Sequence, residues 1–368
     1  MKIGILTFHA SHNYGSMLQA WALQHYLNCN SYDAQIINLR IKDQRNFYRF
    51  PLIPPKNNRR EYIYSFFNPI SIYHACRKWM RYERFLGQYL LLTNKQYNSW
   101  EEVKDDIEHL GYGCIITGGD QIWNMNCIDF SKSYFLPADL GTVKKISYSP
   151  SFGGTFLNRI SSEQEAFIKE ALSDYSYISV RETSMQQYLS GLLHREVQIA
   201  CDPTLLLVAD DYSRFIGDKP IVDGDYIFYY TPTRYMRGEA LAQMIGSHLG
   251  MKVVTSFPHI RRNRMVTVSE AGPAEFLNLV KNAKLIIGKS FHLVVFSLLF
   301  HKEFIAIDGD NDARMKSLLD VLGIPERGLV TEDNFKSIQL LPIDFQTIDI
   351  MLAQERERSQ RFIQKALE

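Results

Sequence analysis

The residues best suited to chemistry stand in one turn between two apolar runs. Lys289, Ser290 and His292 follow the run at 285–287, and a second run at 304–307 closes the segment. We expect the runs to be buried strands, with a helix between them that begins near Ser290. The free amides and positive end of such a helix point at the sheet's carboxyl edge, where α/β folds bind ligands. A lysine, a hydroxyl and a histidine placed there suit an anionic substrate and a proton transfer near neutral pH.

His292 also has a structural interpretation. A single histidine in an apolar helix is more often a core residue with satisfied hydrogen bonds than a catalyst. Spacing alone therefore favours the structural interpretation over the catalytic one.

A second candidate is the segment GGDQIWN at 118–124, which directly follows another apolar run. Glycine there lets a ligand approach the backbone, and Asp120 is suited to act as a base or to bind sugar hydroxyls. The alternative is a tight turn with Trp123 packed beneath it.

Strands and helices alternate along the chain, and these elements must position the candidate residues. Such alternation implies α/β structure, with mostly parallel sheets covered on both faces. In the first half we predict strands at 3–8, 35–39, 114–117, 145–149, 177–180 and 197–201, and helices at 16–28 and 161–173. In the second half we predict strands at 226–231, 252–256, 285–287 and 304–307, and helices at 238–249, 273–283, from 290, 312–322 and 347–367.

At 368 residues the chain is long enough for two domains. We predict a Rossmann-like domain at 1–209, with a basic aromatic insertion at 42–100. A polar linker with glycine and proline follows at 210–224. A second Rossmann-like domain at 225–344 carries the Ser-Phe-His turn, and a charged helix at 345–368 packs back on the first domain.

The composition indicates which cell compartment and which binding partners to expect. The net charge is +1, so the molecule as a whole is no polyanion binder, and its five cysteines form no C-x-x-C pair. This pattern favours a reducing compartment over a disulfide framework. The chain starts with a strand-like run in place of a signal peptide, and no run approaches the length of a membrane span. We expect a cytoplasmic protein.

The segment 42–84 is much more basic than the chain as a whole. It holds ten Lys/Arg against three acids, with aromatic residues interleaved. That composition suits an anionic membrane surface or a nucleic-acid groove, and the alternative is a solvated insertion with a small core of its own. Nucleic acid is the weakest of these options, because no nucleic-acid signature accompanies the charge.

The familiar cofactor and metal motifs do not occur. No G-x-G-x-x-G follows the first strand, and no G-x-x-x-x-G-K-[ST] is present. The segment 308–312 opens like a calcium loop, but Ala313 and Leu319 stand where glycine and glutamate are required. We therefore predict neither a metal nor a cofactor.

Four signatures, in order, give the chain a resemblance to polysaccharide pyruvyl transferases. They are NYGSMLQA at 13–20, GGDQIWN at 118–124, SVRE at 179–182 with DPT at 202–204, and GPAEF at 272–276 with SFH at 290–292 and FSL at 296–298. The chain departs from the family pattern at Leu293 (usually Gly), Gly119 (usually Ser) and Lys289 (more often small or polar). We expect the bulkier Leu293 to narrow the pocket or to tilt the start of the helix.

The resemblance implies an enzyme that moves pyruvate from phosphoenolpyruvate to two hydroxyls of a sugar and releases phosphate. The expected product is a 4,6-ketal of galactose in a repeat unit of a capsular or other exopolysaccharide. The implied architecture is two Rossmann-like domains facing a cleft, like GT-B glycosyltransferases. The acceptor in such pathways is built on a lipid carrier, so the insertion at 42–84 would dock at the inner face of the cytoplasmic membrane.

The charged groups of the donor then suggest a role for each candidate residue. The donor carries a carboxylate and a phosphate, so Arg181 is the expected clamp, and His292 is the expected general acid. Arg181 has an alternative role as a structural partner of Glu182 or Asp202. The remaining expected contacts are Lys289, Ser290 and Phe291 for the second anionic group, and Asp120, Gln121, Asn13, Ser16 and Gly119 for the acceptor side.

Two other functions stay open at this point. A nucleotide-sugar glycosyltransferase shares the two-domain plan and would bind a nucleotide sugar in place of phosphoenolpyruvate. A non-catalytic carbohydrate-binding relative would bind sugar without turnover, as the change at Leu293 allows.

Overall fold

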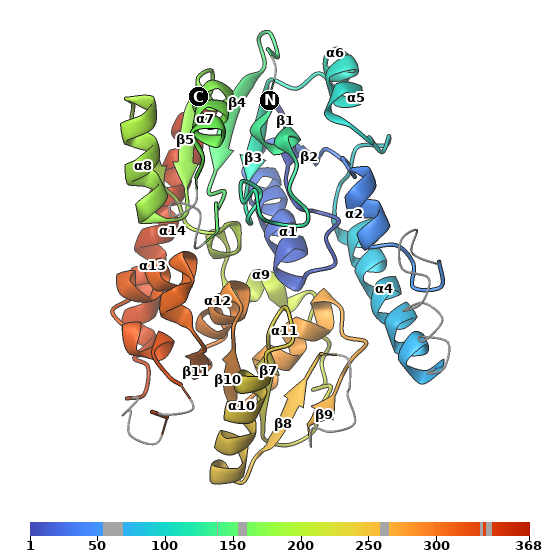
Figure 1. The fold of residues 1–368 in the computed structure, drawn as a ribbon, viewed down its shortest axis with the longest axis vertical. Coiled ribbons are helices and arrows are strands. Elements are labelled where there is room, and N and C mark those ends of the chain that lie inside the picture. The colour runs from blue at the N-terminus through green and yellow to red at the C-terminus, as the bar shows by residue number, and fades with distance from the viewer. Residues whose placement is uncertain (54–68, 138, 154–159, 258–264, 332–333, 336–340) are drawn as a thin grey trace.

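The structure is a computed structural model that describes residues 1–53, 69–137, 139–153, 160–257, 265–331, 334–335 and 341–368. Within these residues the chain forms two parallel sheets with flanking helices, one half above the other in Figure 1. The predicted α/β class with two Rossmann-like halves is confirmed.

The first sheet has six parallel strands in the order β2-β1-β3-β4-β5-β6. The strands are β1 (Lys2–Leu6), β2 (Asp33–Ile36), β3 (Cys114–Gly118), β4 (Lys144–Tyr148), β5 (Tyr177–Val180) and β6 (Gln198–Ile199). Its helices are α1 (Tyr14–Cys29), α2 (Lys42–Phe47), α4 (Pro69–Tyr89), α5 (Trp100–Asp105), α6 (Ile107–Leu110), α7 (Ser162–Leu172) and α8 (Thr183–Leu193), with the 3-10 turn η1 (Lys132–Phe135). Because every pairing is parallel, all six strands end at one edge, which faces the other half.

The second sheet has five parallel strands in the order β11-β10-β7-β8-β9. The strands are β7 (Tyr226–Tyr230), β8 (Lys252–Thr255), β9 (Val266–Thr267), β10 (Leu285–Gly288) and β11 (Phe304–Ala306). The accompanying helices are α9 (Ala209–Ser213), α10 (Met236–Leu249), α11 (Pro273–Asn282), α12 (Phe291–Leu299), α13 (Ala313–Val321) and α14 (Phe345–Leu367), with the 3-10 turns η3 (Pro203–Leu206), η4 (Gly309–Asn311) and η5 (Pro325–Gly328).

Local sequence signals account for where several helices begin. Ser161 and Gln164 form a capping box at α7, and Pro273 opens α11, where its missing N–H costs nothing. Asn13 caps α1 through its side-chain oxygen. All nine residues of α12 are buried, as expected for a helix enclosed between a sheet and the other half.

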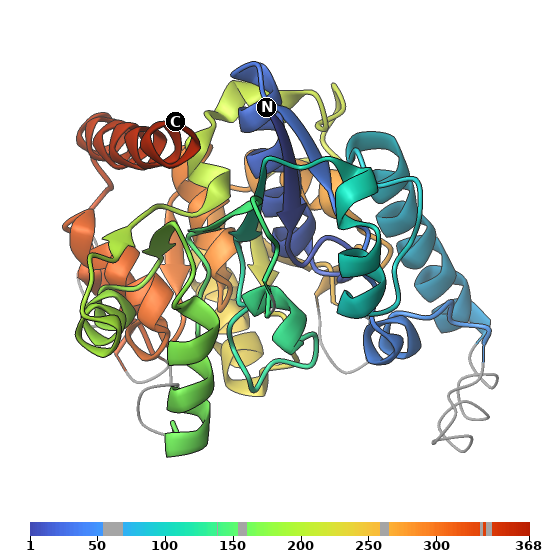
Figure 2. The same cartoon turned by 90° about the horizontal axis from the view of Figure 1, so that it is seen from above.

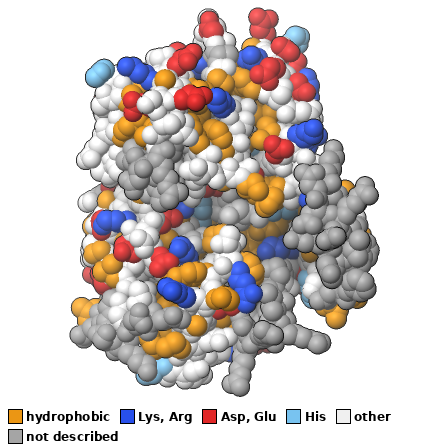
Figure 3. Space-filling model, in the orientation of Figure 1, with side chains coloured by type: hydrophobic (Ala, Val, Ile, Leu, Met, Phe, Trp, Pro, Cys, Tyr) orange, Lys and Arg blue, Asp and Glu red, His pale blue; other side chains and the backbone are white. Residues whose placement is uncertain are grey.

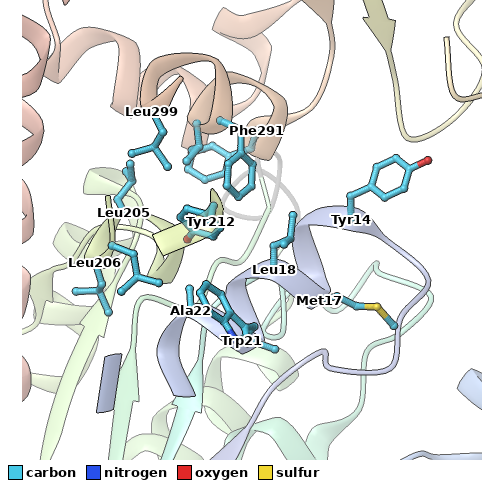
Figure 4. Packing of buried hydrophobic residues seen from close by; sticks show 14 of the residues in the cluster. Tyr14, Met17, Leu18, Trp21, Ala22, Leu205, Leu206, Tyr212, Phe291 and Leu299 are labelled. Carbon is cyan, nitrogen blue, oxygen red and sulfur yellow. The ribbon is translucent and has the colours of Figure 1, made fainter. Parts of the chain in front are cut away.

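Helix α1 connects the two halves through packing (Figure 4). The Tyr14 hydroxyl donates to the carbonyl oxygen of Ala271 at 3.1 Å, and its ring stacks on Phe276 with centroids 4.6 Å apart. Further along α1, Trp21 meets Tyr212, which in turn packs on Phe296 of α12. This shared core holds the start of α1 close to the start of α12.

Helix α14 returns to the first half, where it ends beside the first sheet (Figure 1). Arg356 Nε donates to the carbonyl oxygen of Leu205 at 2.9 Å, and the backbone N–H of Cys201 donates to Ser359 Oγ at 2.9 Å. The helix thus binds the segment that joins the two sheets.

Helix α4 belongs to the basic insertion and lies on the side of the molecule opposite α14 (Figure 2). Its residues Tyr82 and Phe85 are buried in the main core, so this part of the insertion does not form a small core of its own. Arg81 pairs with Glu275 of the second half at 3.2 Å and donates to the carbonyl oxygen of Glu270. The predictions for residues 54–68 fall outside the described part of the chain.

Candidate active site between the two halves

The first half contributes a polar network at the middle of its sheet edge. The Ser16 hydroxyl in the first turn of α1 donates to Asp120 Oδ2. The backbone N–H of Gln121 donates to Asp120 Oδ1 at 2.8 Å. Asn13 holds this turn, because its Oδ1 accepts from the Gly15 amide at 2.9 Å. Four residues predicted to face the acceptor are therefore neighbours in space.

The backbone at position 119 and its neighbour Gln19 explain why this residue is a glycine. Its φ is +71°, in the left-handed region, and a Cβ there would lie 1.7 Å from Gln19 Oε1. A serine at this position would be strained and would collide with Gln19, so glycine fits the turn that presents Asp120.

Arg181 follows β5 and is almost fully buried, with 4% of its side chain exposed. Its Nη2 lies 2.5 Å from Asp202 Oδ2. The structural pairing considered for Arg181 therefore exists with Asp202, whereas Glu182 accepts from the Ser151 hydroxyl. One guanidinium nitrogen, Nη1, has no hydrogen-bond partner within the described part of the chain.

His292 comes from the second half and meets the same carboxylate. Its Nε2 lies 3.3 Å from Asp202 Oδ2, and 7% of its side chain is exposed. The ring packs directly on Gly15, where an added Cβ would lie 1.9 Å from Nδ1. Asp202 thus connects a guanidinium of the first half to an imidazole of the second.

Burial and these partners change the pKa of Asp202 in opposite directions. Burial alone would raise its pKa, but the charges of Arg181 and His292 and a hydrogen bond from Thr204 hold the pKa of Asp202 well below its usual range. Asp202 is therefore ionised, and it sets a buried negative charge against Arg181 and His292.

Arg314 is a site residue that the sequence analysis did not identify. It lies in the first turn of α13, where its Nη2 is 2.7 Å from Asp312 Oδ2. Burial opposes its charge, but Asp312, and then Asp120 and Glu182, keep the pKa of Arg314 above its usual range. An arginine in the first turn of a helix is disfavoured by the helix dipole, and this unusual placement was the available signal.

The Phe291 ring contacts both arginines. The Arg181 Cζ is 4.9 Å and the Arg314 Cζ 5.5 Å from its centroid. We call these three side chains the arginine layer. Two guanidinium groups held on one aromatic ring form a rigid cationic surface next to His292.

Lys289 lies elsewhere. Its Nζ is 2.8 Å from Asp308 Oδ2 and 5.1 Å from the Tyr235 ring centroid, and 42% of its side chain is exposed. Ser290 precedes α12 without a side-chain capping bond. The structure therefore brings together Arg181, His292 and Phe291, but gives Lys289 a different partner.

Leu293 fills space in the second half. It is 1% exposed, and a Cβ on Gly288 would lie 2.5 Å from its Cδ2. The side chain thus occupies room that the strand glycine leaves free.

Between the halves the surface is hollowed, with histidine at its margin (Figure 3). Within the described ranges, no group of three His, Cys, Asp or Glu is placed to hold a metal ion. The described helices include none that combines the length and the apolar character of a bilayer span.

Solved structures show which class this architecture belongs to. They include UDP-GlcNAc 2-epimerase from Methanocaldococcus jannaschii (12% identity, 99% of this chain and 100% of that chain, TM-score 0.51) and S. aureus MnaA with UDP (9%, 98% and 89%, 0.50). At such identities the likeness shows the fold alone, and the fold is GT-B-like. No curated protein sequence matches the chain significantly.

The sequence itself gives the family. The family model for polysaccharide pyruvyl transferase matches residues 13–311. This chain belongs to that family, and it is an enzyme of the transferase class.

Proposed function

We propose that this enzyme transfers pyruvate from phosphoenolpyruvate to two hydroxyls of a sugar, forming the 4,6-ketal of a galactose in a polysaccharide repeat unit. The observation that carries the proposal is the contact of Asp202 with both Arg181 and His292. It sets an anion-binding group of one half beside a proton donor of the other.

The donor is held by the arginine layer. Phosphoenolpyruvate carries a carboxylate and a phosphate, and planar guanidinium groups bind either of them with two hydrogen bonds. The buried Nη1 of Arg181 has no hydrogen-bond partner within the described part of the chain, and Arg314 contacts the same Phe291 ring. We assign to Arg314 the second anion contact that the sequence suggested for Lys289, and the amides at Ser290 and Phe291 support the same group.

His292 supplies the proton. Its imidazolium donates H⁺ to the methylene carbon of the donor, which becomes a methyl group, and the neighbouring carbon becomes electrophilic and oxocarbenium-like. Asp202, 3.3 Å from Nε2, keeps the ring oriented. Binding between two buried surfaces excludes water, which would otherwise capture the cation.

The acceptor approaches from Asp120. One sugar hydroxyl loses its proton to Asp120 and forms a C–O bond to the electrophilic carbon, giving a tetrahedral phosphate adduct. The second hydroxyl then displaces phosphate, which leaves with the C–O bond electrons and that hydroxyl's proton. Ser16, Gln121 and Asn13 orient Asp120 for this role.

The acceptor in this proposal is lipid-linked, and the enzyme is cytoplasmic with peripheral membrane contact. The insertion offers exposed apolar side chains at Phe47, Ile53, Ile70 and Tyr73 among its basic residues. Such a surface suits anionic lipid. Co-sedimentation with anionic liposomes should fall when the exposed Phe47, Ile53, Ile70 and Tyr73 are changed to serine, and equal binding would refute the contact.

The decisive experiment measures phosphate release from phosphoenolpyruvate with a galactose-containing lipid-linked acceptor, together with the mass gain of the product. Release that depends on the acceptor supports the proposal. Binding of a nucleotide sugar, without any turnover of phosphoenolpyruvate, would favour a glycosyltransferase instead. Sugar binding with no turnover of either donor would indicate a non-catalytic relative.

A further inference from the structure

A cavity of about 140 Å³ lies on one side of the arginine layer. It is formed by α8 and the end of β6 from the first half, by α13 from the second, and by α14, which crosses between them. Its inner end is lined by Arg181, Asp202, Phe291 and Arg314, whereas Asp120 and Ser16 do not line it.

The inner end is built for an anion. The Arg181 guanidinium is buried, and its Nη1 has no hydrogen-bond partner among the residues that the structure describes. An unpaired buried N–H of a cation costs free energy unless a ligand or water satisfies it. Arg314 adds a second positive charge at the same end.

The outer end has a different character. Thr183 of the first half and Ser317 of the second both line the cavity and are hydrogen-bonded, with their hydroxyl oxygens 3.5 Å apart. Arg358 of α14, nearly half exposed and paired with Glu355, lines the same cavity. Apolar side chains such as Leu318 and Leu352 also belong to the lining. The lining thus combines one exposed cation with two largely buried ones.

Strand order places this cavity to one side of the acceptor network. Asp120 follows β3 in the middle of the first sheet, whereas the cavity adjoins β5 and β6 at one edge. The insertion helices α2 and α4 stand at the opposite side of the molecule (Figure 2). The arginine layer can therefore be approached from two directions.

We propose that this cavity is the port of the small anionic donor, through which phosphoenolpyruvate reaches Arg181 and inorganic phosphate leaves. The sugar on its bulky carrier then approaches from the Asp120 side. The proposal rests on the proposed function, since it identifies the donor by that reaction. A separate port lets phosphate depart while the ketal product still fills the groove.

The first test narrows the port with Ser317→Trp and uses Lys316→Trp, on the exposed face of the same helix, as the control. We expect the KM for phosphoenolpyruvate to rise at least about tenfold in Ser317→Trp, with the acceptor KM within about twofold of wild type. Lys316→Trp should leave both constants unchanged. An unchanged donor KM, or an equal rise in both constants, would overturn the proposal.

A second variant avoids steric effects on folding. Arg358→Gln removes the cation at the outer end, and Arg361→Gln removes one on the same helix that does not line the cavity. We expect a higher donor KM only in Arg358→Gln, with the difference shrinking as salt is raised, because exposed charges are screened. Equal effects of the two changes would contradict a port at Arg358.

Phosphate binding separates failure of the port from failure of the reaction. Inorganic phosphate should raise the melting temperature of the wild-type protein and protect Ser317→Trp much less. If this difference is seen without turnover of phosphoenolpyruvate, the cavity is an anion site but the proposed reaction is wrong. If turnover occurs and phosphate protects both proteins equally, the port is wrong.

Discussion

His292 and Lys289 stand three residues apart in one turn, yet the protein places them in opposite surroundings. The His292 ring is buried between the halves, 3.3 Å from a carboxylate that also pairs with Arg181. The Lys289 ammonium lies 2.8 Å from Asp308 with 42% of its side chain exposed. The His292–Asp202 contact and the Lys289–Asp308 contact each join a nitrogen base to a carboxylate. The two pairs differ in burial. The comparison shows that packing, and not residue type, decides which charge of a turn acts in the site.

Two features of the backbone produce the difference. Lys289 lies before the helix α12 begins, and its side chain reaches Asp308 in the loop after β11. His292 is inside the helix on the face toward α1, and Gly15 leaves room for its ring. The buried end of the turn therefore depends on the other half of the molecule, and the exposed end does not.

The largest expected effect is loss of the proposed proton donor. His292→Ala should lower kcat by about 10²–10⁴-fold, the usual contribution of a general acid. His301→Ala, at the other and exposed end of α12, is the matched control and should retain full activity. Phosphate release assays on both variants measure this, and full activity of His292→Ala would end the assignment.

Asp202→Asn tests what the shared carboxylate contributes. Removing it leaves Arg181 buried without its counterion, which should lower the free energy of unfolding by about 3–5 kcal/mol. kcat should also fall by more than the donor KM rises, because Asp202 no longer holds the His292 ring in place. Urea unfolding and steady-state kinetics give the two readouts. A stability loss with unchanged kcat would make Asp202 purely structural.

Gly15→Ala tests the contact between the halves. The new Cβ would lie 1.9 Å from His292 Nδ1, so the ring or the start of α1 must move. We expect a destabilisation of about 1–3 kcal/mol and a fall in kcat greater than the change in donor KM. Gly191→Ala, a helix glycine with open space around it, is the control and should be neutral or slightly stabilising. Normal kcat in Gly15→Ala would show that the ring position is not critical.

Much of this arrangement could be predicted from the sequence, but not the choice between the two ends of the turn. Alternating apolar runs predicted the two sheets, and the Ser-Phe-His and Asp-Gln motifs predicted the edges that meet. Those signals are local. The partner of Lys289 and the role of Arg314 depend on contacts between segments far apart in the chain. The sequence predicted a helix at 312–322 and so placed Arg314 in its first turn, but the Phe291 ring and the Asp120 carboxylate that act on Arg314 belong to distant segments.

Acid titration of stability tests the buried carboxylate of Asp202 directly. The folded pKa of Asp202 lies below its unfolded value, so its ionisation stabilises the fold above the unfolded pKa of about 3.9. That stability is lost as pH falls from there toward the folded pKa. Buried Glu182 acts in the opposite sense, because burial raises its folded pKa and its ionisation costs stability. Subtracting the pH dependence of Asp202→Asn from that of wild type should isolate a loss below about pH 4. A flat difference would contradict the assignment.

The smallest effect is expected at the exposed end. Lys289→Ala removes an ion pair that water largely screens, so stability should change by about 0–1 kcal/mol. Because Arg314, and not Lys289, stands on the arginine layer, the donor KM should change much less than in Arg314→Ala. Donor titrations of the two variants under the same salt decide this. If Lys289→Ala raised the donor KM as much as Arg314→Ala, both ends of the turn would bind the donor, and the contrast between them would apply to stability alone.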